Sequence, residues 1–258
     1  MRIEVMTGGI GVTLDILLPE SWRKYRPQKA RVMWLLHDKF DTSSDWVSFT
    51  QAELFASMYD IALVCPTMGN GRYNDGIHTS QWETYFEEMW DYVHDFLPIL
   101  SRRPEDNMLF GFARGAFGAL KFSLTHPERF GWVYTVSYDD AFLAGVREGK
   151  AHSFPTGSGY GTPEEFEKSR DNLLGFAAQF AASGSPMPAV YMNCMSGDKT
   201  YKRNLEVRDE LNRLGFSVNW ECTDASGKRL DDSSSGANGD WFFCNEQLKR
   251  ALAIASAK

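Results

Sequence analysis

The middle of the chain contains the stretch Leu109-Phe110-Gly111-Phe112-Ala113-Arg114-Gly115-Ala116-Phe117-Gly118-Ala119-Leu120. The apolar residues up to Phe110 have the pattern of a buried strand, and a helical pattern follows Gly115. Glycines two positions before and after residue 113 match the pattern Gly-x-Ser-x-Gly, in which a sharp strand-to-helix turn presents a serine above a sheet. Position 113 is alanine here, so the turn is predicted to form without a nucleophile.

Composition indicates a globular protein of one domain. The chain has 258 residues, 43% of them hydrophobic, and its 27 basic and 34 acidic residues give a net charge of −7. That charge argues against nucleic acid or an anionic membrane as a partner, because both need a basic surface. No apolar run approaches the roughly 20 residues of a membrane span, and no signal-peptide pattern is found at the start. The four cysteines lack C-x-x-C spacing, so we expect buried free thiols in a cytoplasmic protein.

Strand-like and helix-like segments alternate along most of the chain. This order predicts an α/β fold with a mostly parallel, doubly wound sheet, whose ligands approach from the carboxyl ends of the strands. The alternation breaks down over about 139–188, and we predict a lid-like insertion there within a single domain of residues 1–258. The predicted strands are 11–18, 31–37, 61–66, 108–110, 132–137, 189–194 and 216–222. The predicted helices are 46–59, 85–97, 116–124, 163–182 (as one or two), 205–214 and 241–256.

Five groups of motif residues are spread over nearly the whole chain. They are Leu35-Leu36-His37 with Ser44-Asp45-Trp46; Pro66 with Asn70-Gly71-Arg72-Tyr73-Asn74-Asp75; Gly111 to Lys121 with His126-Pro127-Glu128-Arg129-Phe130; Asp198 with Tyr201 and Asn204; and Gly239-Asp240-Trp241-Phe242-Phe243 with Gln247-Leu248. Together they resemble the esterase-D-like branch of the α/β-hydrolases, which includes tributyrin esterases, S-formylglutathione hydrolases, feruloyl and acetylxylan esterases, and mycolyltransferases. The resemblance implies the α/β-hydrolase fold and a triad in the order serine, acid, histidine.

The departures from the family pattern all fall on its chemistry. By the resemblance, the nucleophile position is Ala113 and the histidine position is Gly239, and no histidine follows His152. Asp198, at the acid position, is then the only retained member of the triad. Asp38 replaces the glycine after the family's histidine in the segment that binds the oxyanion, where an inward carboxylate would oppose a developing negative charge.

The resemblance also implies an oxyanion segment and a cleft above the elbow. Zinc spacings and glycine-rich phosphate loops are absent, and the acidic residues between 224 and 240 do not match a calcium loop, so we expect no metal and no cofactor. The expected oxyanion segment contains Asp38, Lys39 and Arg114. Lys39, Arg114 and Arg72 could place positive charge around the elbow and accept an anionic ligand, although solvated surface charges are the simpler interpretation. The expected cleft residues are His37, which is structural in the family, Trp46, Tyr73 and Trp241.

Three functions are compatible with the sequence. The leading hypothesis is an esterase-family protein that has lost hydrolytic activity and keeps its cleft for a small ligand or a protein partner, with a homo-oligomer also possible. The second is an active hydrolase of short acyl esters or acylated sugars that uses another nucleophile, such as Cys194 or Ser196. The third is an interaction or structural protein whose cleft is filled by its own side chains.

Overall fold

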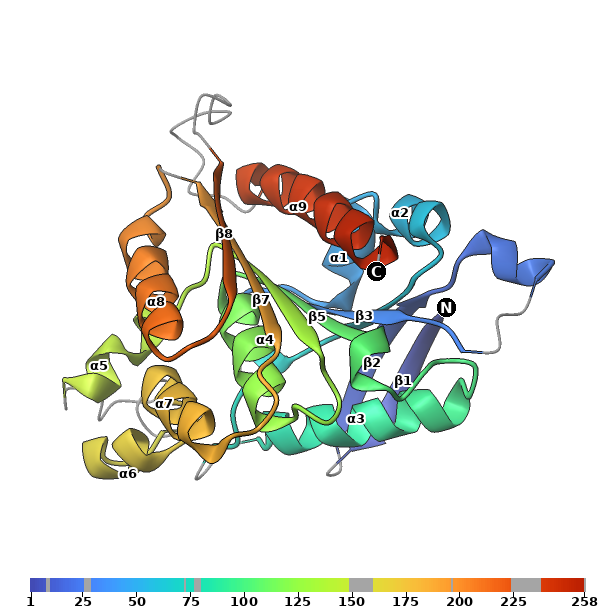
Figure 1. Ribbon diagram of the computed structural model, residues 1–258. Coiled ribbons are helices and arrows are strands. Elements are labelled where there is room, and N and C mark those ends of the chain that lie inside the picture. Colours follow the sequence, from blue (N-terminus) through green and yellow to red (C-terminus); the bar gives the residue numbers. More distant parts are fainter. Residues whose placement is uncertain are drawn as a thin grey trace.

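The computed structural model describes residues 1–7, 10–25, 29–71, 73–76, 80–148, 160–195, 197–223 and 238–257. These residues form an eight-stranded sheet in the order β1-β2-β4-β3-β5-β6-β7-β8, with helices on both faces (Figure 1). β2 pairs antiparallel with β1 and β4, and the other neighbours are parallel, so the predicted mostly parallel, doubly wound sheet is confirmed. The strands are β1 (Arg2–Thr7), β2 (Ile10–Leu17), β3 (Val32–Leu36), β4 (Ala62–Pro66), β5 (Asn107–Phe112), β6 (Trp132–Val136), β7 (Ala189–Met195) and β8 (Val218–Thr223).

The sheet separates two apolar layers. In β3, Trp34 points into one layer and Leu35 into the other, which explains why this strand is apolar throughout. One layer lies under α1 (Ser43–Phe49), α2 (Ala52–Tyr59) and α9 (Asn238–Ser256), and the other under α3 (Trp82–Phe96), α4 (Arg114–Thr125), α7 (Leu173–Ser183) and α8 (Tyr201–Arg213) (Figure 1). Shorter helices are η1 (Glu20–Arg23), η2 (Gly69–Gly71), η3 (Pro104–Asp106), η4 (Ala141–Leu143), α5 (Ala144–Arg147) and α6 (Pro163–Lys168).

Two local differences from the predicted elements have clear physical causes. The helix predicted over 46–59 is divided into α1 and α2, because Thr50 is extended and its hydroxyl takes over backbone hydrogen bonds. That hydroxyl donates to the carbonyl of Trp46 and accepts from the amide of Ala52 at 3.1 Å, so it ends one helix and helps to begin the next. β1, which was not predicted, adds an edge strand to β2.

The segment 139–188 is only in part a cover over the strand ends. Its later portion, α7, packs against α4 and α8 and buries Leu173, Ala177 and Phe180 in the core. A buried ion pair of 2.7 Å between Asp171 and Lys121 of α4 fixes the start of this portion. The predicted lid therefore contains a core helix, and among its described residues several from 139 to 147 line the cavity beside the elbow. Among the described residues, no helix is both long and apolar enough to cross a membrane.

Gly115 allows α4 to approach the end of β3, and its replacement is predicted to destabilise the fold. A Cβ at Gly115 would lie 2.0 Å from the Leu36 carbonyl oxygen, so Gly115→Ala requires backbone movement and is expected to cost about 3 kcal/mol or more. Gly184→Ala is the control: its φ of +74° is strained for alanine but no atom lies within 4 Å, so about 1 kcal/mol is expected. Urea denaturation measures both free energies of unfolding, and equal losses would contradict the prediction.

Candidate functional site

The elbow predicted from the glycine spacing is present and is built around Ala113. β5 ends at Phe112 and α4 begins at Arg114, while Ala113 between them has φ 53° and ψ −112°. This backbone conformation is unfavourable for any residue with a Cβ and costs about 1–3 kcal/mol. Two hydrogen bonds hold it: the Ala113 amide donates to Val136 at 2.9 Å, and its carbonyl accepts from the Asp139 amide at 3.2 Å. The strained turn thus presents a methyl group at its apex.

The carboxylate of Asp38 lies at the backbone amide that follows the elbow. The Arg114 amide donates to Asp38 Oδ1 at 3.2 Å, and the Lys39 amide also hydrogen-bonds to this carboxylate. Burial raises the pKa of Asp38, and the two amide hydrogen bonds partly offset that effect. The inward orientation considered from the sequence is therefore the one that the structure adopts.

His37 has a structural role that fixes the chain just before Asp38. Its Nε2 accepts a hydrogen bond of 2.8 Å from the Met68 amide, so the proton lies on Nδ1, which donates to the Asp38 carbonyl at 2.6 Å. Burial lowers the pKa of His37 to about 4, so the imidazole is neutral at neutral pH. The Tyr73 hydroxyl donates to the His37 carbonyl at 2.5 Å. These contacts hold the backbone from which the Asp38 side chain reaches the elbow.

Three aromatic residues expected to wall the cleft are buried in the core instead. Trp46 exposes 0% of its surface and Trp241 2%, and their rings meet edge to face between α1 and α9, with centroids 4.9 Å apart. Tyr73 exposes 1% and packs so closely on Gly118 that a Cβ there would lie 2.3 Å from its ring. His37 is also buried. Of the residues expected at the site, Arg114 and Lys39 line a cavity beside the elbow.

That cavity has a volume of about 570 Å³, and five of its twelve lining residues are lysine or arginine. The buried Asp140 carboxylate pairs with Arg147 at 2.6 Å and with Arg203 at 2.8 Å, so these two cations are already neutralised in part. The Arg114 guanidinium lies over the Phe142 ring, 4.6 Å from its centroid. The lining residues are Lys39, Arg114, Asp139, Asp140, Ala141, Phe142, Ala144, Arg147, Lys199, Thr200, Arg203 and Glu206.

Three of the cavity cations have no carboxylate partner among the residues that the structure describes. These are Arg114 at the elbow, Lys39 after β3, and Lys199 before α8. Sequence reasoning selected Lys39 and Arg114 but missed Lys199, Arg203 and Arg147. A weak signal was available for Lys199, because it follows Asp198 just after a predicted strand.

Asp198, at the acid position, lies in the turn between β7 and α8. Asp198 Oδ1 accepts hydrogen bonds from the Thr200 amide at 2.7 Å and from the Thr200 hydroxyl at 2.8 Å, and so caps the turn that leads into α8. Gly239 is in the first turn of α9. Cys194 is buried, as are Cys65 and Cys244, whereas Cys222 is exposed, contrary to expectation. Arg72 and Ser196 lie outside the described residues.

Comparison with known proteins identifies relatives of this architecture. A family model described as "Putative esterase" matches residues 9–143, just over half of the chain. The fluorophosphonate-binding serine hydrolase FphF of Staphylococcus aureus superposes with a TM-score of 0.83 at 20% identity, over 99% of this chain and 97% of that one. S-formylglutathione hydrolase (FrmB) of the same organism gives 0.81 at 20%, over 99% and 98%. An S-formylglutathione hydrolase from Agrobacterium tumefaciens gives 0.75 at 15%, over 99% and 94%. No curated protein sequence matches significantly.

The turn after β3 is predicted to make stability depend on pH through Asp41. Burial, with the nearby carboxylates of Asp38 and Asp45, raises the pKa of Asp41 to about 7. Because the folded pKa lies above the unfolded one, this carboxylate destabilises the fold increasingly as pH rises from about 4 to about 7. Asp41→Asn, which keeps an acceptor for the Asp38 amide, should therefore raise the Tm more at about pH 8 than at about pH 5. Calorimetry at both pH values checks this, and an equal Tm change at the two would contradict it.

Proposed function

Because the chain belongs to the family described as "Putative esterase" and has the α/β-hydrolase fold, we propose that it is a member that does not hydrolyse esters and binds a small anionic molecule beside its elbow. One observation carries the proposal: the Asp38 carboxylate accepts the hydrogen bond of the Arg114 amide, next to an alanine at the apex of the elbow. The Asp38 carboxylate thus occupies the Arg114 amide, a hydrogen-bond donor that ester hydrolysis in this fold requires.

Acyl transfer at such an elbow needs two groups. A nucleophile at residue 113 would attack the ester carbonyl, and the amide of the next residue would stabilise the negative oxygen that results. Ala113 supplies no nucleophile, and the substrate oxygen would have to displace Asp38 and then develop charge beside it. Loss of a triad nucleophile costs about 10⁶ in kcat, and loss of one oxyanion donor about 10²–10³. The first change alone is sufficient to remove measurable turnover.

The other triad positions support the same conclusion. The family resemblance assigns the histidine to Gly239, and the sequence has no histidine beyond His152. Asp198, which would orient that histidine, has its carboxylate engaged with Thr200 at the start of α8. Once the nucleophile is lost, catalysis no longer maintains its partners, because triad residues act as a unit.

The surroundings of Cys194 do not favour it as an alternative nucleophile. Burial, with Asp198 nearby, raises the pKa of Cys194 to about 12, so the thiol is protonated at neutral pH, whereas nucleophilic cysteines are thiolates. A cleft filled by its own side chains is also not favoured, because a cavity of about 570 Å³ adjoins the elbow. Neither alternative therefore replaces ligand binding as the proposal.

The lining of the cavity favours a small organic anion with a carboxylate or phosphate group. Arg114, Lys39 and Lys199 supply positive charge without a described ion-pair partner, and charge-assisted hydrogen bonds to such cations are strong. Phe142 under the Arg114 guanidinium limits the directions in which that side chain can point. The apolar side chains of Ala141, Phe142 and Ala144 can contact the uncharged part of the ligand.

The loss of hydrolysis is tested directly with p-nitrophenyl acetate. The purified protein should release p-nitrophenol no faster than the heat-denatured protein. The double change Ala113→Ser with Gly239→His should stay slow while Asp38 occupies the Arg114 amide, and adding Asp38→Gly should increase the rate by about tenfold or more. Wild-type turnover that survives repeated purification and disappears in Cys194→Ala would instead establish the second hypothesis.

Anion binding is tested by calorimetric titration with inorganic phosphate and with succinate. Binding of either anion should weaken about tenfold in Arg114→Gln and in Lys199→Gln, because each change removes a charged donor. Lys249→Gln, an exposed lysine on α9 remote in sequence from the lining, is the control and should leave affinity unchanged. Absence of saturable heat for both anions at low ionic strength would count against the proposed ligand class.

A further inference from the structure

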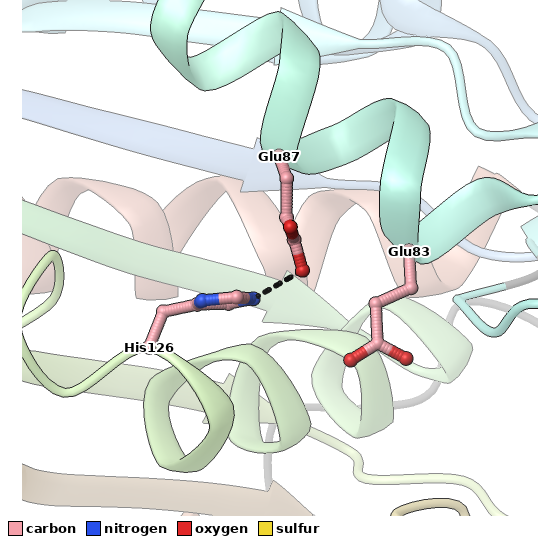
Figure 2. A group of neighbouring side chains, drawn as sticks. All are labelled: Glu83, Glu87 and His126. Atoms are coloured by element: carbon pink, nitrogen blue, oxygen red, sulfur yellow. Dashed lines mark ion pairs between the residues drawn. The ribbon is translucent and has the colours of Figure 1, made fainter. Parts of the chain in front are cut away.

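A second group of chemistry-bearing side chains lies between α3 and the end of α4, and none of its members lines the cavity. Glu83 and Glu87 are four residues apart on α3 and therefore project from the same face of that helix. His126 follows the last residue of α4 and points toward them (Figure 2). One ligand atom from each of the three side chains lies within 4.8 Å of the other two.

We propose that Glu83, Glu87 and His126 form a binding site for a divalent transition-metal ion, of which Zn²⁺ is the reference case. One imidazole and two carboxylates are ligands that zinc accepts, with bond lengths of about 2.0–2.2 Å. Atoms already within 4.8 Å of one another reach such lengths with small side-chain rotations. The site is independent of the proposed anion-binding function.

The state of the imidazole points to a missing partner. His126 exposes 8% of its surface, and its Nε2 is buried without a hydrogen-bond partner. That nitrogen nevertheless lies 3.1 Å from Glu87 Oε1, in a geometry that is not a hydrogen bond (Figure 2). On the other side of the ring, Nδ1 lies 3.6 Å from Glu128 Oε1. Metal-bound histidines commonly have a carboxylate beside the second ring nitrogen, and Glu128 lies on that side here, just beyond hydrogen-bond distance.

The ion pairs around the site neutralise Glu83 but not Glu87. Glu83 contacts Lys121 at 2.8 Å and Arg170 at 3.2 Å, and Lys121 also contacts Asp171, so these four groups balance. Glu87 is different: among the residues that the structure describes, its ion-pair partner is His126. Burial lowers the pKa of His126, and the nearby Arg129 guanidinium acts in the same direction. Within the part of the chain that the structure describes, no lysine or arginine forms an ion pair with the Glu87 carboxylate, and each Glu83 oxygen keeps a second acceptor position.

A metal ion here would join two helices that cover the same face of the sheet. The ion would bridge residues that are far apart in sequence and come together only in the folded chain. Its binding would therefore stabilise the fold. Glu87 is half-buried, which gives the ion a route from solvent and leaves a position for water. The inferred role is therefore a clamp between α3 and α4.

The test uses the full chain after EDTA treatment, titrated with ZnCl₂ in a calorimeter and with CoCl₂ in a spectrophotometer. We expect one equivalent of tight binding, a Tm higher by about 5 °C at saturating Zn²⁺, and a Co²⁺ spectrum without thiolate charge-transfer bands. Glu87→Gln and His126→Gln should each weaken binding at least tenfold and abolish the Tm rise. The neighbouring Glu88→Gln, on the exposed side of α3, is the matched control and should behave as wild type.

Two outcomes would overturn the proposal. One is the absence of one-equivalent binding in the wild type. The other is binding that persists in Glu87→Gln or shows thiolate bands, because the ion would then be held by cysteine. Glu87→Gln changes a half-buried side chain and is expected to fold, so its result stands even if His126→Gln is unstable; circular dichroism confirms the fold of each variant.

Discussion

The hydrogen bond from the Arg114 amide to the Asp38 carboxylate joins the end of β3 to the first turn of α4. Gly115 makes this contact possible, because without a side chain the helix can lie against the carbonyls of Leu36 and His37. The carboxylate then occupies the amino end of a helix, where a negative charge is favoured. This favourable field explains how Asp38 is accommodated although burial raises its pKa. The proposed loss of hydrolysis rests on this contact together with the alanine at the elbow apex.

The elbow could be predicted from sequence because its determinants are local. Gly111 and Gly115 are required where the backbones of strand and helix meet, and their spacing is visible without a structure. The position of Asp38 next to the elbow was also predictable, since both follow neighbouring parallel strands. Its orientation was not, because it depends on the hydrogen bonds that Met68 and Tyr73 make with His37 from a distant loop.

The aromatic residues and the proposed metal ligands show where sequence reasoning failed. Trp46 and Trp241 belong to motifs near a catalytic centre, but α1 and α9 pack together and bury both rings against each other. Glu83 and His126 are 43 positions apart, and they meet only because α3 and α4 cover the same face of the sheet. No local spacing encodes either arrangement. The contribution of Arg203 from α8 to the cavity wall was missed for the same reason.

Among the described residues, ion pairs hold the segment between β6 and β7 to the helical layer at its beginning and again near its middle, and this has a consequence for molecular recognition. Asp140 is paired with Arg203 of α8 near its beginning, and Asp171 with Lys121 of α4 farther along. Removing one partner of such a buried pair costs about 3–5 kcal/mol, so neither point opens readily. The described walls of the proposed anion-binding cavity are accordingly preorganised, so an anion would lose little affinity to ordering them. Under the proposed function, selectivity would then come from fit of the ligand to these fixed walls.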